Sequence, residues 1–299
     1  MDTAAAEIAN SRMLGWRMRV AAFVELTKPR IAFMLVLTSA AGFYLGNKDP
    51  FDFALFANAM IGILILAFGV ATLNQYLERS TDAVMDRTKN RPLPSMRLAP
   101  TEALIFGLVQ CAVAEIYLYF LVNPLTAALG LVVIGGYVLL YTPLKTRTSA
   151  STAIGAIPGA MPPLMGWTAS ADEITLGAWA LFLMLFLWQF PHFLAIAWMY
   201  KEQYAKAGIL MLPVVDPSGR ITARQIVLFA IMLLPVSLAP FFLGFAGLVY
   251  LIGATVLGLW FLFESVRTAR AKTVERARRL LMVSVLYLPL IFGLLVLDH

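Results

Sequence analysis

A strip of acidic and amide side chains recurs at every fourth residue of one segment, at Asn74, Glu78, Asp82 and Asp86. On a helix each step of four residues drifts by about 40°, so the first three lie within one face about 80° wide. Asp86 points well away from that face unless the helix has already ended. Two carboxylates and an amide that converge can hold Mg²⁺, which substrate phosphates usually complete.

Three cations, Arg87, Lys89 and Arg91, follow the strip directly. Guanidinium and ammonium groups are well suited to phosphate oxygens. Acids that hold a metal, next to bases that hold an anion, are the combination that diphosphate binding requires. An ordinary solvated helix end with paired charges would have similar residues, and spacing alone does not decide between the two interpretations.

A second polar segment, residues 188–215, has Glu202 as its one carboxylate before Asp216, with Lys201, Tyr204 and Lys206 around it. By itself this segment is typical of an interfacial loop. We expect it to lie on the same side of the membrane as the strip and to face the strip across a cavity.

The composition requires that membrane-spanning helices position these residues. The chain of 299 residues is 61% hydrophobic and 13% charged, with a mean hydropathy of +0.81. A soluble globule has about 25% charged residues. Spanning the hydrocarbon takes roughly 20 apolar residues as a helix. The sequence therefore predicts an all-α, polytopic membrane protein with nine spans, near 29–46, 54–77, 102–122, 124–143, 151–170, 176–199, 224–243, 245–263 and 279–297.

The distribution of basic residues predicts the orientation. With nine spans, all of the 23 lysines and arginines except Lys48 fall on one side. The positive-inside rule makes that side cytoplasmic, with the N-terminus inside and the C-terminus outside. The strip and Glu202 lie on the same side. Topology and contact with anionic lipid explain most of the formal charge of +6, and we expect no nucleic-acid partner.

Several polar or aromatic residues lie at membrane depth. Glu115 in the third span either has a functional role or makes a buried structural hydrogen bond. His192, which follows Pro191, is either a hydrogen-bonded interior residue or a ligand. Tyr141 either packs at the interface or lines a pocket for a cationic intermediate.

Together these residues resemble the UbiA superfamily of intramembrane prenyltransferases, whose first metal motif looks like Asn74-Gln75-x-x-Glu78-x-x-x-Asp82 here. Within the superfamily the chain is most similar to the branch that farnesylates haem. Met85-x-Arg87-Thr88, followed by Arg91-Pro92-Leu93, is specific to that branch. The resembling segments are 26–31, 74–94, 141–148, 154–167 and 188–215.

The resemblance implies that farnesyl diphosphate, haem B and water give haem O and diphosphate, in a cavity surrounded by nine helices. It implies a Mg²⁺ site at Asn74, Glu78 and Asp82, with Glu202 as a further catalytic residue. It also implies a cytoplasmic segment at 1–28 and one transmembrane prenyltransferase domain at 29–299. The candidates for binding diphosphate or haem are Arg87, Lys89, Arg91, Lys145, Arg147, Lys201, His192 and Tyr141.

One position departs from the family pattern. Gln203 offers a neutral carbonyl where a second carboxylate is expected beside Glu202. We therefore expect the first strip to provide more of the metal binding than in typical relatives.

The expected location is a bacterial plasma membrane rather than the mitochondrial inner membrane, and a haem A synthase is a candidate partner. Two alternatives remain at this stage. One is a related transferase that acts on an aromatic ring such as 4-hydroxybenzoate. The other is a cation-coupled transporter, since Glu115 and the proline-broken spans also suit one.

Overall fold

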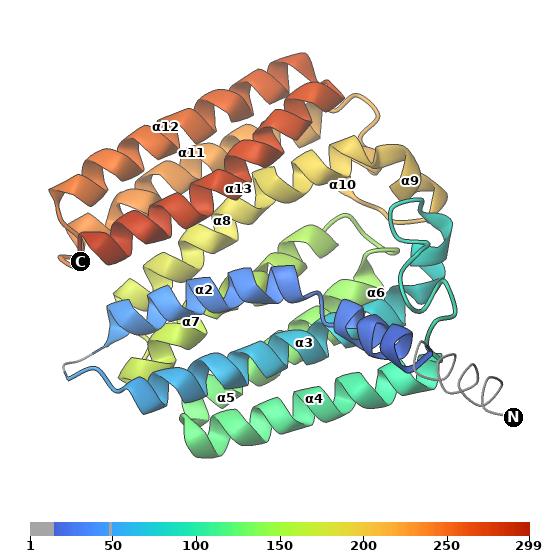
Figure 1. Cartoon of the computed structure of the whole chain (residues 1–299). Helices are drawn as coiled ribbons and strands as arrows, with labels where there is room; N and C mark the ends of the chain where they lie inside the picture. The colour runs from blue at the N-terminus through green and yellow to red at the C-terminus, as the bar shows by residue number, and fades with distance from the viewer. Residues whose placement is uncertain (1–14, 48–49) are drawn as a thin grey trace, which may run out of the picture.

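The computed structural model describes residues 15–47 and 50–299, and every regular element in these ranges is helical. Arg12 and Lys48, which contribute to the charge distribution above, lie outside the described residues, as does the first half of the predicted segment 1–28. The long helices run side by side in one bundle, with α8 and α11 to α13 on one side of it and α2 to α7 on the other (Figure 1).

The helices agree closely with the predicted spans. Eight of them are long and apolar enough to cross a membrane, and the chain is a polytopic membrane protein. The remaining predicted span, the fifth (151–170), corresponds to α7, which is 21 residues long but contains three prolines. Most of α7 is buried by other helices, so it does not need the hydropathy of a lipid-facing helix. The long helices are α2 (Pro29–Gly46), α3 (Phe53–Val84), α4 (Pro100–Leu121), α5 (Pro124–Ile134), α7 (Ser151–Ala171), α8 (Leu176–Met199), α11 (Arg220–Phe242), α12 (Leu248–Ala271) and α13 (Val274–Leu297).

Short polar residues and prolines determine where these helices begin. Asp52 accepts hydrogen bonds from the amides of Ala54 and Leu55, and Asn123 accepts one from Thr126. Thr175 and Thr273 cap α8 and α13 in the same way. Such caps satisfy amides that have no partner within the helix.

The fourth predicted span is not a uniform helix. After α5 the chain forms a π-helix, η1 (Gly135–Tyr141), and then the short α6 (Thr142–Leu144). The wider π turn places Tyr137 and Tyr141 edge to face, with ring centroids 4.9 Å apart. π segments are rare and occur often at functional sites, and this one leads directly into Thr142 and Lys145.

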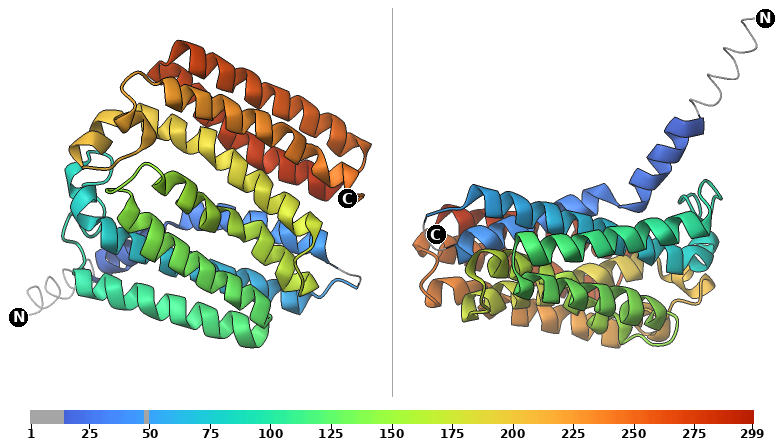
Figure 2. Two further views of the ribbon diagram at one scale, coloured as in Figure 1. Left: turned by 180° about the vertical axis from the view of Figure 1, so that it is seen from behind. Right: turned by 90° about the horizontal axis from the view of Figure 1, so that it is seen from below.

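A helix at residues 15–26 precedes the first span and was not predicted, because its apolar run is short. Ala22 and Leu26 pack against Leu93, Leu98 and Ala103. The contact fixes this helix to the connection between α3 and α4, while its other end projects away from the bundle (Figure 2). The connection around Lys28 is thereby held beside the end of α3.

The helices α2 and α7 approach each other closely at two glycines. A Cβ at Gly166 would clash with the backbone carbonyl of Ser39, and a Cβ at Gly42 would clash with that of Pro163. Gly166→Ala should therefore lower the free energy of unfolding by about 1–3 kcal/mol, because a backbone cannot move aside as a flexible side chain can. Thermal unfolding in detergent measures this. Gly293→Ala is the control, since nothing lies within 4 Å of a Cβ at that position.

Candidate active site

The three strip residues that were predicted to share a face, Asn74, Glu78 and Asp82, all lie on α3. This helix continues to Val84 and is longer than the predicted span. Asn74 and Asp82 are both 1% exposed, so they face the protein rather than solvent. The helix ends before Asp86, which is exposed and accepts a hydrogen bond of 2.6 Å from Lys89. That hydrogen bond holds the pKa of Asp86 below its usual value. Asp86 therefore does not extend the strip.

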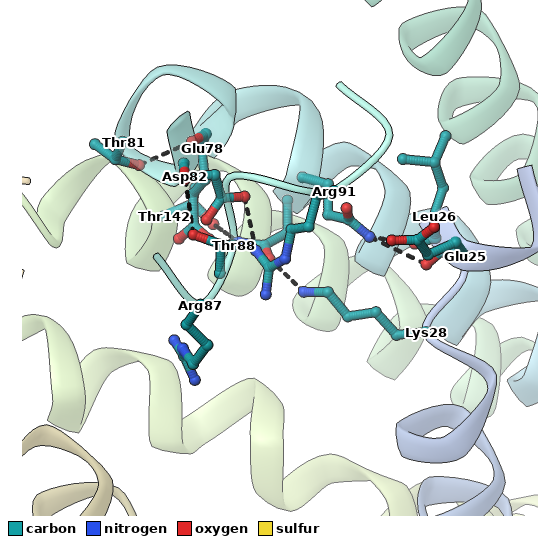
Figure 3. Close-up of polar contacts among 12 residues, drawn as sticks. Glu25, Leu26, Lys28, Glu78, Thr81, Asp82, Arg87, Thr88, Arg91 and Thr142 are labelled. Carbon is teal, nitrogen blue, oxygen red and sulfur yellow. Dashed lines mark hydrogen bonds and ion pairs between the residues drawn. The ribbon is translucent and has the colours of Figure 1, made fainter. Parts of the chain in front are cut away.

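Each strip residue is bonded to a cation from a different segment of the chain. Lys28 Nζ donates to Asn74 Oδ1 at 2.9 Å, and Lys145 Nζ donates to Glu78 Oε1 at 2.5 Å. Arg91 donates to Asp82 Oδ2 at 2.7 Å. Figure 3 shows Lys28 and Arg91 lying next to each other at the strip.

Further hydrogen bonds hold the segments that carry these cations. Thr142, at the end of the π-helix, accepts from Asn74 Nδ2 at 3.2 Å and donates to the Tyr137 carbonyl at 2.8 Å. The amide of Gln75 donates to the Leu26 carbonyl at 3.0 Å, and Thr88 donates to the Asp82 carbonyl at 2.8 Å. The strip and its cations are thus built from four separate parts of the chain.

The two lysines at the strip, Lys28 and Lys145, differ in the direction in which their pKa is shifted. Burial, and then the nearby Arg91, lower the pKa of Lys28 to about 8. Burial alone would also lower the pKa of Lys145, but the attraction of Glu78 outweighs it and holds that pKa well above its usual value. Lys145 therefore stays charged at neutral pH, while Lys28 lies close to its titration midpoint in mildly alkaline solution.

A cavity of about 220 Å³ lies beside the Glu78–Lys145 pair. Its wall includes four residues with hydroxyl groups and three apolar residues besides the ion pair. The lining residues are Leu77, Glu78, Ser80, Thr81, Thr142, Pro143, Lys145, Thr146 and Ile209. The ion pair is therefore accessible to a small polar ligand rather than sealed.

The second polar segment, which the sequence predicts to face the strip across a cavity, contacts the loop after α3. Arg87 donates to the Tyr204 hydroxyl at 3.2 Å, and its guanidinium lies 5.0 Å from the centre of the Tyr200 ring. The amide of Arg87 also donates to Gln203 Oε1 at 3.4 Å. Gln203 thus uses its carbonyl to join the two segments. Glu202 on α9 (Lys201–Lys206) is exposed, and the structure records no contact between it and the strip.

The remaining predicted binding residues have separate positions. The Lys145 ammonium lies 4.3 Å from the centre of the Tyr141 ring. Lys201 lies 5.9 Å from the Trp198 ring, and Arg147 is exposed. Arg91 and Lys145 are thus the predicted cations that touch the strip. Lys28 was missed, because the sequence provided only its charge, which served to predict topology.

Two residues at membrane depth lie away from the strip. His192 on α8 is hydrogen-bonded to Ser284 at 2.7 Å between Nδ1 and Oγ. The carboxylate of Glu115 lies against Gly130, and neither of its oxygens has a hydrogen-bond partner in the described part of the chain.

The donor atoms at the strip suit Mg²⁺ only with help from a substrate. Among the described residues, no three acidic, histidine or cysteine side chains cluster as a metal site would require. Two carboxylates and one amide are hard oxygen donors, but too few to surround the ion. Mg²⁺ is commonly bound by one or two carboxylates and completed by substrate phosphates, so these residues fit a metal–diphosphate complex.

The sequence is similar to a known protein family and to named proteins from bacteria. The model of the UbiA prenyltransferase family matches residues 35–288. Protoheme IX farnesyltransferase of Solibacter usitatus is 50% identical over 286 residues, which cover 93% of this chain and 98% of that protein. The protein of the same name from Koribacter versatilis is 42% identical, with 93% of each chain covered.

Solved structures show the same fold at low sequence identity. A digeranylgeranylglyceryl phosphate synthase matches with a TM-score of 0.77 and 16% identity, over 94% of this chain and 98% of its own. A UbiA homolog from Archaeoglobus fulgidus bound to GPP and Mg²⁺ matches with a TM-score of 0.70 and 16% identity, over 92% and 99%.

Proposed function

Since the chain belongs to the UbiA prenyltransferase family, we propose that it transfers a farnesyl group from farnesyl diphosphate to the 2-vinyl group of haem B. Water adds in the same reaction, and the products are haem O and diphosphate. Similarity to proteins named protoheme IX farnesyltransferase over almost the whole chain supports the choice of donor and acceptor. The strip on α3, with a cation bonded to each member, is the structural observation that supports diphosphate chemistry.

Asn74, Glu78 and Asp82 would hold Mg²⁺ together with the diphosphate of the donor. The homolog from Archaeoglobus fulgidus bound to GPP and Mg²⁺ supports this assignment. The ion supplies positive charge that offsets the charge developing on the diphosphate as the allylic carbon–oxygen bond breaks. We assign no metal to Glu202, which the structure leaves exposed.

Lys28, Arg91 and Lys145 would bind the diphosphate oxygens. All three already lie at hydrogen-bonding distance from the strip, so they are near any anion held there. Charged hydrogen bonds of this kind are about twice as strong as neutral ones. The ring of Tyr141 beside Lys145 offers an aromatic face for the allylic cation.

Arg87 would bind a propionate group of the haem. It points away from the strip (Figure 3) and lies against Tyr200 at the end of α8 and Tyr204 on α9, whereas the other three cations surround the strip. This division separates the anion of the donor from the anions of the acceptor.

The low pKa of Lys28 makes diphosphate binding depend on pH. Below about pH 8 Lys28 is charged, and above it the ammonium is lost and attracts the anion less. In Lys28→Arg the guanidinium stays protonated. Without Mg²⁺, the ratio of the variant's affinity for inorganic diphosphate to that of the wild type should be flat below about pH 8 and should rise above it. Calorimetric titration at several pH values measures the ratio, and a ratio constant with pH contradicts the prediction.

The proposed reaction is tested with purified protein, haem B, farnesyl diphosphate and Mg²⁺. Mass analysis of the porphyrin should show haem that has gained a farnesyl group and a hydroxyl group. Parallel assays supply 4-hydroxybenzoate in place of haem B. Prenylated benzoate without farnesylated haem, in a folded sample, would refute the proposed acceptor.

The protein is proposed to lie in a bacterial plasma membrane with its N-terminus in the cytoplasm. The basic residues that flank the spans support this orientation, because they gather on one side. A haem A synthase, which would take haem O further, remains the proposed partner.

A further inference from the structure

His192 lies in α8, seven residues before the helix ends at Met199, and therefore about 10 Å below that end. Glu78 lies six residues before the end of α3, at about 9 Å. The two helices belong to different walls of the bundle, with α2 and α7 between them in Figure 1. His192 and Glu78 thus lie on helices from different walls of the bundle, each about two turns before the end of its helix.

The hydrogen bonds of Ser284 determine which nitrogen of His192 carries the proton. The Ser284 hydroxyl has one proton and donates it to the Leu281 carbonyl at 2.6 Å. With that proton on the Leu281 carbonyl, the hydroxyl accepts from His192 Nδ1, 2.7 Å away. Nδ1 carries the hydrogen, and in a neutral imidazole Nε2 then has a lone pair.

Two contacts fix the orientation of this imidazole. Trp188 is stacked on it, with ring centroids 4.7 Å apart and an angle of 25° between the planes. The indole N–H of Trp188 in turn donates to the Ser284 carbonyl at 2.9 Å. A histidine that binds a metal through one nitrogen usually has its other N–H held by a partner in this way, which fixes tautomer and orientation.

Nε2 itself is available to a ligand. The structure shows no hydrogen bond to it within the described residues, and it is not among the buried polar atoms without a partner. Since His192 is only partly buried, Nε2 contacts accessible space at membrane depth. A fixed lone pair at that position is an unusual feature for a residue that only packs.

We propose that His192 Nε2 is an axial ligand to the iron of the haem acceptor, with Ser284 and Trp188 as its positioning residues. This inference rests on the proposed function. Neutral imidazole is a common ligand of haem iron. Iron coordination forms no carbon bond, but it holds the porphyrin in place for prenyl transfer. Arg87, which lies against Tyr200 at the end of α8, would bind a propionate at the edge of the porphyrin.

The test compares haem B with metal-free protoporphyrin IX, because only the first can form the bond to Nε2. In His192→Ala, the affinity for ferric haem B should fall by about a hundredfold. Losing only the hydrogen-bond partner of a metal ligand costs about 10- to 100-fold in affinity, so losing the ligand itself should cost at least as much. Affinity for protoporphyrin IX should change by less than about twofold. The optical and electron paramagnetic resonance spectra of bound haem should lose the histidine signature, and added imidazole should restore it.

Ser284→Ala removes the partner of Nδ1 but keeps the ligand, and it should weaken haem binding by about tenfold. His299→Ala is the matched control, since His299 is bonded to the Phe245 carbonyl near the C-terminus and should leave the spectrum unchanged.

An unchanged haem spectrum in His192→Ala overturns the inference. If turnover is lost while the spectrum is unchanged, His192 acts as a base or as a structural residue and not as an iron ligand. An equal loss of affinity for haem and protoporphyrin also overturns it. In both cases a wild type that still makes farnesylated haem leaves the proposed function intact. A wild type with a histidine-ligated haem spectrum but no farnesylation refutes the function and retains the site.

Discussion

Asp82→Asn should lower the rate of haem farnesylation by on the order of a thousandfold while leaving the protein folded. The side chain is 1% exposed, and asparagine has the same shape and can still accept the hydrogen bond from Arg91. What the variant loses is the negative charge, which the proposed metal–diphosphate complex requires. Product analysis by mass, over a range of Mg²⁺ concentrations, measures both the rate and the Mg²⁺ requirement.

Two other acids serve as controls for Asp82. Glu202→Gln should lower the rate by less than about tenfold, because Glu202 is exposed and has no recorded contact with the strip. Asp86→Asn should have little effect, since this carboxylate lies past the end of α3 and binds Lys89. Equal losses in Asp82→Asn and Glu202→Gln would show that the second segment contributes as much to metal binding as the first. That result would contradict the assignment of the metal to α3.

The sequence predicts those parts of the site that depend on position along one helix. Spacing of four residues places Asn74, Glu78 and Asp82 on one face, and the structure shows them on one helix. Asn123 and Pro124 mark the start of α5 in the sequence and in the structure. Such features follow from local geometry and capping, which the sequence states directly.

The partners of the strip could not be predicted in the same way. Lys28 and Asn74 are 46 positions apart, and Lys145 and Glu78 are 67 apart. Several cations near the strip have the right charge, and only the packing of the helix at residues 15–26 and the π turn at Gly135–Tyr141 selects among them. The π turn has little signal in the sequence, because the same residues could also continue an α-helix.

The Glu78–Lys145 pair should be important for stability as well as for activity. Their side chains are 13% and 16% exposed, so each charge depends on the other. Lys145→Met leaves a largely buried carboxylate without its partner, and such losses cost about 3–5 kcal/mol of unfolding free energy. Glu78→Gln with Lys145→Met removes both charges and should recover most of that stability. The free energy of unfolding of both variants, of Glu78→Gln alone and of the wild type, measured in one detergent, gives a double-mutant cycle.

Activity should follow a different pattern from stability in this cycle. Each of the three variants should lose at least about a hundredfold in turnover, because neither the metal ligand nor the cation for diphosphate is restored by removing the other. Recovery of stability without recovery of turnover would separate the structural role of the pair from its role at the substrate. If the double variant were as unstable as Lys145→Met, the unpaired charge would not be the cause of the instability, and the loss of the ammonium from the face of Tyr141 would account for it.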